Sequence, residues 1–157
     1  MGFAKEKRPV LNKSLKYIGS NVHNKRAIVS LTAANLIAMN GAPVQILAAP
    51  AAGKAYVVKS FLFEMKRTTT PFTGGGAISL QYHTTTTSVP HEGTVPATEL
   101  TTAGAATTLR QLGMPTGANG VPIPAAEGID ITNATGAFAA GTGTAVVYLD
   151  YDEVTLQ

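Results

Sequence analysis

Short runs of β-branched and aromatic residues, separated by stretches rich in glycine, proline and threonine, constrain the fold of this chain most strongly. The longest run, KAYVVKSFLFEMKR at residues 54–67, predicts a strand. Its alternation is imperfect, which is typical of a strand buried on much of both faces. Alternation predicts two opposite faces: Val58, Ser60, Leu62 and Glu64 on one, and Val57, Lys59, Phe61, Phe63 and Met65 on the other.

Five further segments have the same strand-like texture. The segment at 77–84 alternates cleanly, with Ile78 and Leu80 on the buried side, as in a half-buried antiparallel strand. Near the C-terminus, Val147, Leu149 and Tyr151 are predicted to face away from Asp150 and Asp152. The five predicted strands are 26–31, 43–49, 77–84, 129–135 and 145–154.

Helices are expected to be few and short. Thr32 is a candidate N-cap for a helix of one or two turns over 32–41, which Asn40-Gly41 would end. The segment 99–113 fits a short helix or a weak strand, and a helix with Leu109 and Leu112 packed inward is favoured slightly. We therefore predict a mainly β fold, an antiparallel β-sandwich or jelly-roll-like body with one or two short helices.

The segments between these elements predict loops. Residues 68–76 contain three consecutive glycines, which predict a flexible loop without regular structure. Residues 84–98 are rich in threonine and contain two prolines, and we expect an exposed loop or edge there. Residues 136–143 predict a glycine-rich turn.

Charge divides the chain into two parts. Residues 1–26 carry seven basic side chains against one acidic, a net charge of +6, whereas residues 27–157 carry five against eight, a net charge of −3. A basic extended arm (1–26) attached to a β-sandwich body (27–157) is the expected organisation. The apolar residues between the arm's charges favour contact with a partner over a purely solvated tail. The residues expected to make that contact are Lys5, Lys7, Arg8, Lys13, Lys16, Tyr17, Lys25 and Arg26.

The partner of such an arm could be a nucleic acid or an anionic protein surface. Cationic side chains alone would give salt-dependent binding to phosphates. However, only Phe3 and Tyr17 could stack on bases in the arm, and the body is acidic. A mildly acidic protein surface is therefore the favoured partner, and no specific nucleic acid is expected.

The Gly53-Lys54 pair raises the possibility of a phosphate-binding loop. Such a loop needs an earlier glycine where Ala48 stands and a serine or threonine where Ala55 stands. It must also open a helix, whereas a strand is predicted after Lys54. We interpret Pro50 to Gly53 as a turn between two strands.

Other catalytic and metal sites are not predicted either. The chain has no cysteine, and its three histidines, His23, His83 and His91, do not have a tight metal-ligand spacing, although His83 and His91 could approach across a hairpin. The carboxylates of DYDE (150–153) suggest a solvated strand edge with a weak cation option. No nucleophile motif or pair of facing carboxylates is recognisable. We expect no catalytic residue, cofactor or metal, and no enzymatic activity.

Targeting signals are also missing from the sequence. No apolar run approaches the roughly 20 residues that a membrane-spanning helix needs. The first residues, MGFAKEKRPVLNK, lack the apolar stretch of a secretory signal. A soluble product made in the cytoplasm, without membrane contact, is expected.

Three longer stretches carry a resemblance to a known group of proteins. They are LTAANLIAMNGAPVQILAAPAAGKAYVVKSFLFEM (31–65), FTGGGAISLQY (72–82) and ITNATGAFAAGTGTAVVYLDY (131–151). In their order and spacing they resemble small structural proteins of tailed phages encoded near capsid genes. The arm and residues 84–98 lie outside the shared pattern.

The resemblance implies a capsid decoration, or cement, protein of the virion with a jelly-roll-like body. Such a bacteriophage protein is made in the host cytoplasm and sits on the outer capsid surface, where a homotrimer would bridge subunits of the major capsid protein and the basic arm would lie on the partner. The alternative is a receptor- or glycan-binding virion module, such as a head fibre or tail tip, that uses residues 84–98 and Tyr82.

Overall fold

Strands of alternating side chains build two antiparallel sheets in the computed structural model, which describes residues 24–89, 94–113 and 123–156. The larger sheet has the order β1 (Lys25–Leu31), β9 (Thr144–Thr155), β3 (Lys54–Lys66) and β6 (Thr107–Leu112). The smaller sheet has the order β2 (Val44–Leu47), β7 (Ile129–Thr132) and β5 (Ser79–Tyr82). Two-residue strands β4 (Thr73–Gly74) and β8 (Phe138–Ala139) pair separately, and two short helices complete the fold, α1 (Ala33–Ala38) and α2 (Thr98–Thr101).

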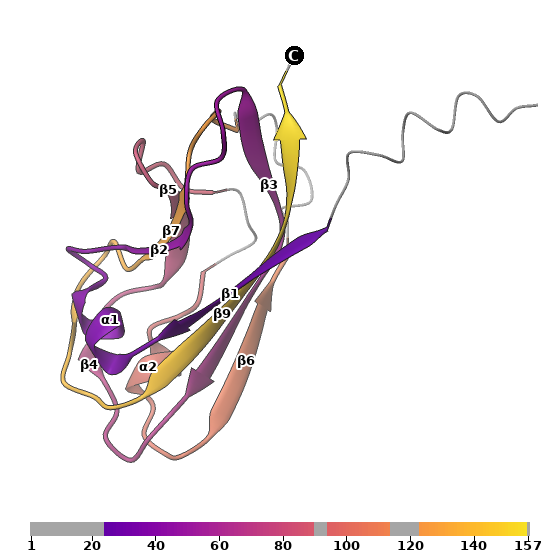
Figure 1. Ribbon diagram of the computed structural model, residues 1–157. Coiled ribbons are helices and arrows are strands. Elements are labelled where there is room, and N and C mark those ends of the chain that lie inside the picture. The colour runs from indigo at the N-terminus through magenta and orange to yellow at the C-terminus, as the bar shows by residue number, and fades with distance from the viewer. Residues whose placement is uncertain (1–23, 90–93, 114–122, 157) are drawn as a thin grey trace, which may run out of the picture.

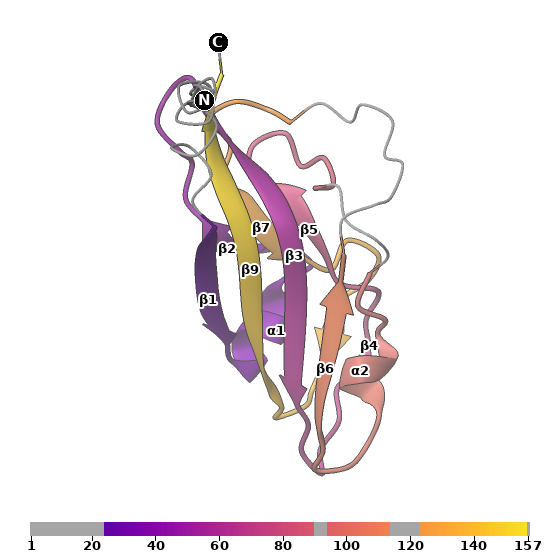
Figure 2. The same cartoon turned by 90° about the vertical axis from the view of Figure 1, so that its right-hand side faces the viewer.

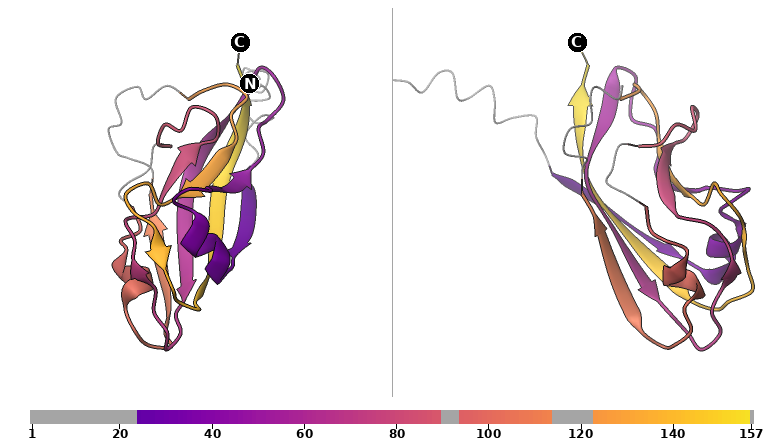
Figure 3. Two further views of the ribbon diagram at one scale, coloured as in Figure 1. Left: turned by 90° about the vertical axis from the view of Figure 1, so that its left-hand side faces the viewer. Right: turned by 180° about the vertical axis from the view of Figure 1, so that it is seen from behind.

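The two sheets form the layers of a β-sandwich, which confirms the predicted fold class. Figure 1 shows the two layers from the side, with α1 and α2 near one end. Figure 2 looks at the outer side of the larger sheet, with β2, β7 and β5 behind it, and Figure 3 gives the opposite views. Apart from the short β4 and β8, successive strands along the chain alternate between the two sheets.

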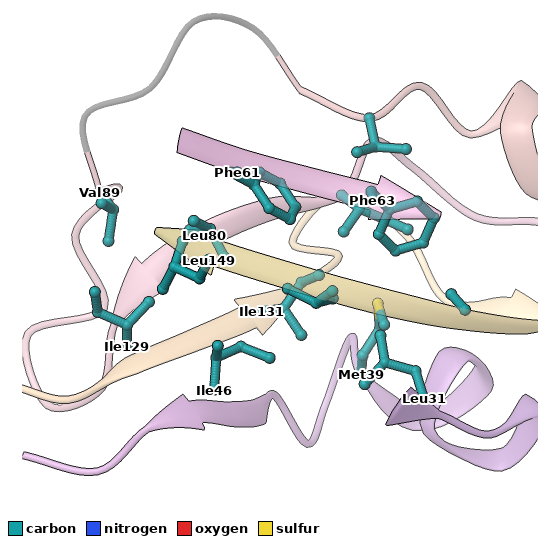
Figure 4. Packing of buried hydrophobic residues seen from close by; sticks show 14 of the residues in the cluster. Leu31, Met39, Ile46, Phe61, Phe63, Leu80, Val89, Ile129, Ile131 and Leu149 are labelled. Atoms are coloured by element: carbon teal, nitrogen blue, oxygen red, sulfur yellow. The ribbon is translucent and has the colours of Figure 1, made fainter. Parts of the chain in front are cut away.

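The core lies between the layers, where apolar side chains from both sheets meet (Figure 4). Phe61 and Phe63 of β3 and Leu149 of β9 point inward from the larger sheet, and Ile129 and Ile131 of β7 point inward from the smaller one. All five are fully buried. Each such side chain contributes about 1.5–3 kcal/mol through removal of apolar surface from water, so this layer of contacts holds the sheets together.

The helix α1 and the turn before β3 form as the sequence predicted. The Thr32 hydroxyl accepts a hydrogen bond from the amide of Asn35, and the Asn35 side chain accepts one from the amide of Thr32, which makes a complete capping box. At the turn, the Lys54 amide donates to the carbonyl of Ala51 over 3.1 Å, and Gly53 has a φ of +75°. A strand follows directly, as expected for a turn without a phosphate-binding role.

A β-bulge in β3 changes the predicted faces of the longest strand. Register with β9 shifts between Val58 and Ser60, so the extra residue, Lys59, interrupts the alternation. Val58 therefore points into the core, where it is only 3% exposed, instead of sharing a face with Ser60. The prediction that Val58 lies on the face of Ser60, Leu62 and Glu64 is wrong because a one-residue bulge reverses which side each residue faces.

The ambiguous segment 99–113 is mostly strand. The helix α2 ends at Thr101, and β6 pairs with β3 from Thr107 to Leu112. Leu109 is 59% exposed, so the favoured helix with Leu109 packed inward is wrong, whereas Leu112 is partly buried. Pairing with β3, which is distant in sequence, decides the structure of this segment over its local preferences.

The glycines of residues 68–76 allow this loop to lie close to the loop that contains Phe138 and Ala139. Thr73 and Gly74 pair with Ala139 and Phe138, so the loop predicted to lack regular structure contains a short strand, β4. Gly75 has a φ of +81°, and a Cβ atom there would lie 2.1 Å from the Phe138 ring. Only glycine suits this position, because a side chain would strain the backbone at this φ and its Cβ atom would clash with the Phe138 ring.

We predict that Gly75→Ala lowers the free energy of unfolding by about 2–4 kcal/mol, since left-handed backbone strain adds to a clash with a buried ring. Gly53→Ala is the matched control, because Gly53 has a similar φ and open space around its Cβ position. It should cost only the backbone strain of about 1–2 kcal/mol. Urea unfolding of both variants measures the difference, and equal losses would contradict the close packing of Phe138.

Candidate binding surface

The outer face of the larger sheet carries apolar side chains at its centre. Alternation along β1, β9, β3 and β6 points one residue in two away from the core, and the strand register places these residues in rows. One row joins Ile28, Tyr148 and Leu62, and the next joins Val146, Glu64 and Leu109. Ile28 and Leu109 are 60% and 59% exposed. We call the residues Ile28, Leu62, Leu109, Val146 and Tyr148 the apolar outer face.

A hollow of about 200 Å³ lies within this face, with Leu62, Leu109 and Tyr148 among its lining residues. Glu64 also lines it and accepts a hydrogen bond of 2.8 Å from the Tyr148 hydroxyl. That hydrogen bond, together with desolvation and the carboxylate's charge, raises the pKa of Tyr148. Among the described residues, no cationic group lies within ion-pair distance of Glu64.

Arg26 stands at the edge of this hollow and is neutralised within the sheet. Its guanidinium donates to both carboxylate oxygens of Asp150, over 2.6 and 2.9 Å, and the Ser60 hydroxyl donates to the same carboxylate over 2.8 Å. The hydrogen bond from Arg26 is the main cause of a lowered pKa of Asp150. A second hollow adjoins the first and is lined by Asn24, Arg26, Lys59, Ser60 and Asp150.

Lys25 and Arg26, which the sequence assigned to the arm, belong to β1. Lys25 forms an ion pair with Glu153 and Arg26 forms one with Asp150, so both cations bind their own chain. The sheet therefore begins at Lys25, two residues before the predicted boundary of the body. The other predicted contact residues, Lys5, Lys7, Arg8, Lys13, Lys16 and Tyr17, lie outside the described residues.

Glu153 joins three strands at the end of the larger sheet. The Lys25 ammonium of β1 lies 2.6 Å from one of its oxygens, and the Lys54 ammonium of β3 lies 2.5 Å from the other. These two hydrogen bonds, Lys25 first, lower the pKa of Glu153 to about 2. The carboxylate therefore neutralises two cations and fixes the edges of β1 and β3 against β9.

Glu99 forms a buried charge cluster beneath β6. Its carboxylate accepts hydrogen bonds from Arg67 over 2.8 Å, from Thr108 over 2.7 Å and from Arg110. Burial alone would raise the pKa of Glu99, but the hydrogen bonds from Thr108 and Arg110 and the charges of both arginines outweigh it and lower the pKa. This cluster attaches α2 to β6 and to Arg67, the residue after β3, and is structural.

The remaining predicted ligands do not assemble a metal site. His83 Nδ1 lies 2.7 Å from the buried carboxylate of Asp130, whereas His23 and His91 lie outside the described residues. Asp150 and Asp152 are in the central strand β9 and pair with Arg26 and Lys59, so the predicted solvated edge is wrong. Within residues 24–89, 94–113 and 123–156, no group of three or more histidines and carboxylates could hold a metal ion.

The apolar outer face could not be predicted from the sequence because its residues come from four strands. Each of them alternates with core residues, but only the register shows that Ile28, Leu62 and Leu109 lie on the same side. The signal that could have indicated it is the presence of apolar residues on both predicted faces of residues 54–67, a pattern that predicts a strand buried on much of both faces.

Comparison with known proteins gives no relative: no family model matches the chain, and no curated protein or solved structure is significantly similar to it. Of the two helices that the structure describes, neither is long and apolar enough to cross a membrane. The function is therefore inferred from the sequence and from the geometry of the described residues.

We predict that Glu99→Gln lowers the free energy of unfolding by about 2–4 kcal/mol, because it removes the charge that Arg67 needs in a buried place. The side chain of Arg67 is 13% exposed and that of Arg110 is 53% exposed. Arg110→Gln is therefore the control, with an expected loss below about 1 kcal/mol. Urea unfolding followed by circular dichroism measures both, and a loss for Glu99→Gln no larger than the control's would contradict a buried cluster.

Glu153 should make stability depend on acid pH. Its pKa lies below the unfolded value, so its contribution is complete above the ordinary pKa of 4.5 and is lost as the pH falls toward about 2. We expect the melting temperature of the parent chain to fall over this window and that of Glu153→Gln to fall less steeply. Thermal unfolding at a series of pH values measures both slopes, and parallel curves would contradict the assignment.

Proposed function

We propose that this chain is a non-enzymatic structural protein that decorates a phage capsid and stabilises it by bridging capsid subunits. The observation that supports this most directly is the apolar outer face, a sheet surface on which Ile28 and Leu109 are more than half exposed and whose hollow is lined by the Glu64 carboxylate. It is suited to contact with protein, since exposed apolar patches with polar rims mark interaction sites. Asn24, the first residue that the structure describes, lines the hollow that adjoins this face.

A jelly-roll body is part of this proposal, and the strand order supports it. The chain alternates between the sheets through β1, β2, β3, β5, β6, β7 and β9. Val95 forms an isolated antiparallel bridge to Ile78 beside β5, which extends the smaller sheet on that side. Two antiparallel sheets of this interleaved order are what a double-sheet jelly roll requires.

The arm would attach the body to the capsid by charge complementarity. Lys25 and Arg26 neutralise carboxylates of their own sheet, so the cations that remain for a partner are the ones nearer the N-terminus. Lys5, Lys7 and Arg8 are clustered there against one acidic residue, Glu6. In a homotrimer, three such arms would act together and turn weak contacts into firm attachment.

The test is co-sedimentation of the full chain with purified tailed-phage capsids that lack their decoration protein. We expect the parent chain to sediment with shells, and a Lys5→Gln, Lys7→Gln, Arg8→Gln variant to bind several-fold more weakly, with less dependence on salt. The matched control carries Ala34→Glu, Gln45→Glu and Thr69→Glu, which lower the net charge equally at exposed body positions.

Two outcomes would overturn the proposal. One is a parent chain that stays in the supernatant at every salt concentration. The other is equal weakening by the arm variant and by the control, because net charge rather than the arm would then govern binding.

A further inference from the structure

We propose that residues 11–17 of the chain's own arm lie across the apolar outer face, with the Lys13 side chain in the hollow against Glu64. The proposal concerns the free protein, in which this segment would cover the face that the proposed function assigns to the capsid, so capsid binding would displace it. It requires no capsid and is tested on the isolated protein. The apolar outer face has the shape and chemistry of a docking surface, and the arm has the complementary sequence.

Most outward side chains in the middle rows of this face are apolar, so a covering segment would be stabilised by burying them. In an antiparallel sandwich the outward residues are ordinarily polar, as Lys66 and Thr144 are here toward one end of the sheet. Across the middle rows, Ile28, Tyr148, Leu62, Val146 and Leu109 form a continuous patch through four strands. Burying Ile28 and Leu109, each more than half exposed, would remove the largest part of that apolar surface from water.

The negative charge of Glu64 favours a positively charged side chain in the hollow. Its only hydrogen bond within the described part of the chain comes from Tyr148, and it has no cation there. Leu62, Leu109 and Tyr148 line the hollow around it and can pack against an aliphatic stem. Because Asp150 already neutralises Arg26, a lysine in the hollow would meet no unpaired like charge at the rim.

The arm contains a matching sequence, LNKSLKY at residues 11–17. In an extended conformation, Leu11, Lys13, Leu15 and Tyr17 point to one side, about 6.6 Å apart, while Asn12, Ser14 and Lys16 point to the other. Leu62 and Glu64 have the same spacing along β3. Lys13 opposite Glu64 therefore places a leucine on each side of the ion pair, one over Leu62 and the other over the aliphatic stem of Lys66.

The arm of the same chain reaches this position. Asn24, the first residue that the structure describes, lines the second hollow with Lys59 and Ser60. Glu64 lies four residues beyond Ser60, or about 13 Å along β3. Residues 14–23 join Lys13 to Asn24 and would span up to about 33 Å if fully extended, which leaves room for a reversal at the turn sequence Gly19-Ser20-Asn21. An attached segment also has a high effective concentration, which favours it over a second copy.

The experiment uses a single thiol introduced into the full chain, which has no cysteine of its own. Leu109→Cys reports coverage of the apolar outer face, and Ala34→Cys, at an exposed position on α1, is the reference for an open surface. We expect the thiol of Leu109→Cys to react with a maleimide about tenfold more slowly than the reference, as for a site covered about nine-tenths of the time. Adding Lys13→Glu should raise its rate toward the reference.

Charge exchange tests the contact itself. With Lys13→Glu in place, adding Glu64→Lys should restore slow labelling, whereas Lys5→Glu, which makes the same charge change outside residues 11–17, should leave labelling slow. Labelling should also be independent of protein concentration over about a hundredfold range, because docking is intramolecular.

Three results would overturn the proposal. Equal rates for Leu109→Cys and the reference mean that the face is open. Protection that Lys13→Glu leaves intact, or that Glu64→Lys fails to restore, excludes the ion pair. Protection that grows with concentration assigns the covering segment to another copy. None of these results bears on capsid binding, so failure here leaves the proposed function standing.

Discussion

The antiparallel pairing of β3 with β9 is the interaction on which the rest of the structure depends. The pair runs from Lys54 opposite Thr155 to Lys66 opposite Thr144, and both strands are central in the larger sheet. Their inward residues, such as Phe61 and Leu149, form one wall of the core, and their outward residues form the middle of the apolar outer face. The bulge at Lys59 sets which residues belong to which side, because it shifts the alternation by one position.

Charged groups on β9 fix the neighbouring strands against this pair. Asp150 binds Arg26 of β1 and Ser60 of β3, and Glu153 binds Lys25 of β1 and Lys54 of β3. Each carboxylate is thus shared between the two strands that flank β9. An antiparallel sheet of this kind gains register specificity from such pairs more than stability, since exposed ion pairs contribute little energy each.

The strands and the core could be predicted from the sequence wherever the signal is local. Clean alternation identified β5 and β9, and the capping sequence identified α1, because neighbouring residues alone determine these elements. The bulge at Lys59 and the strand β6 could not be predicted, since both depend on pairing with strands far along the chain. The apolar outer face was inaccessible for the same reason: it exists only once four strands are in register.

Most carboxylates of the described residues are held in pairs within their own chain. Asp150, Asp152, Glu99 and Glu153 neutralise cations of their own chain, and Glu127 accepts the amide of Thr84. A catalytic acid or base must exchange protons with a substrate, and groups held in such structural pairs are not arranged for it. Glu64 differs, because it faces the hollow of an apolar surface with one tyrosine as its partner. A negative charge in that setting selects a cationic partner with apolar neighbours, which is the pattern of the arm.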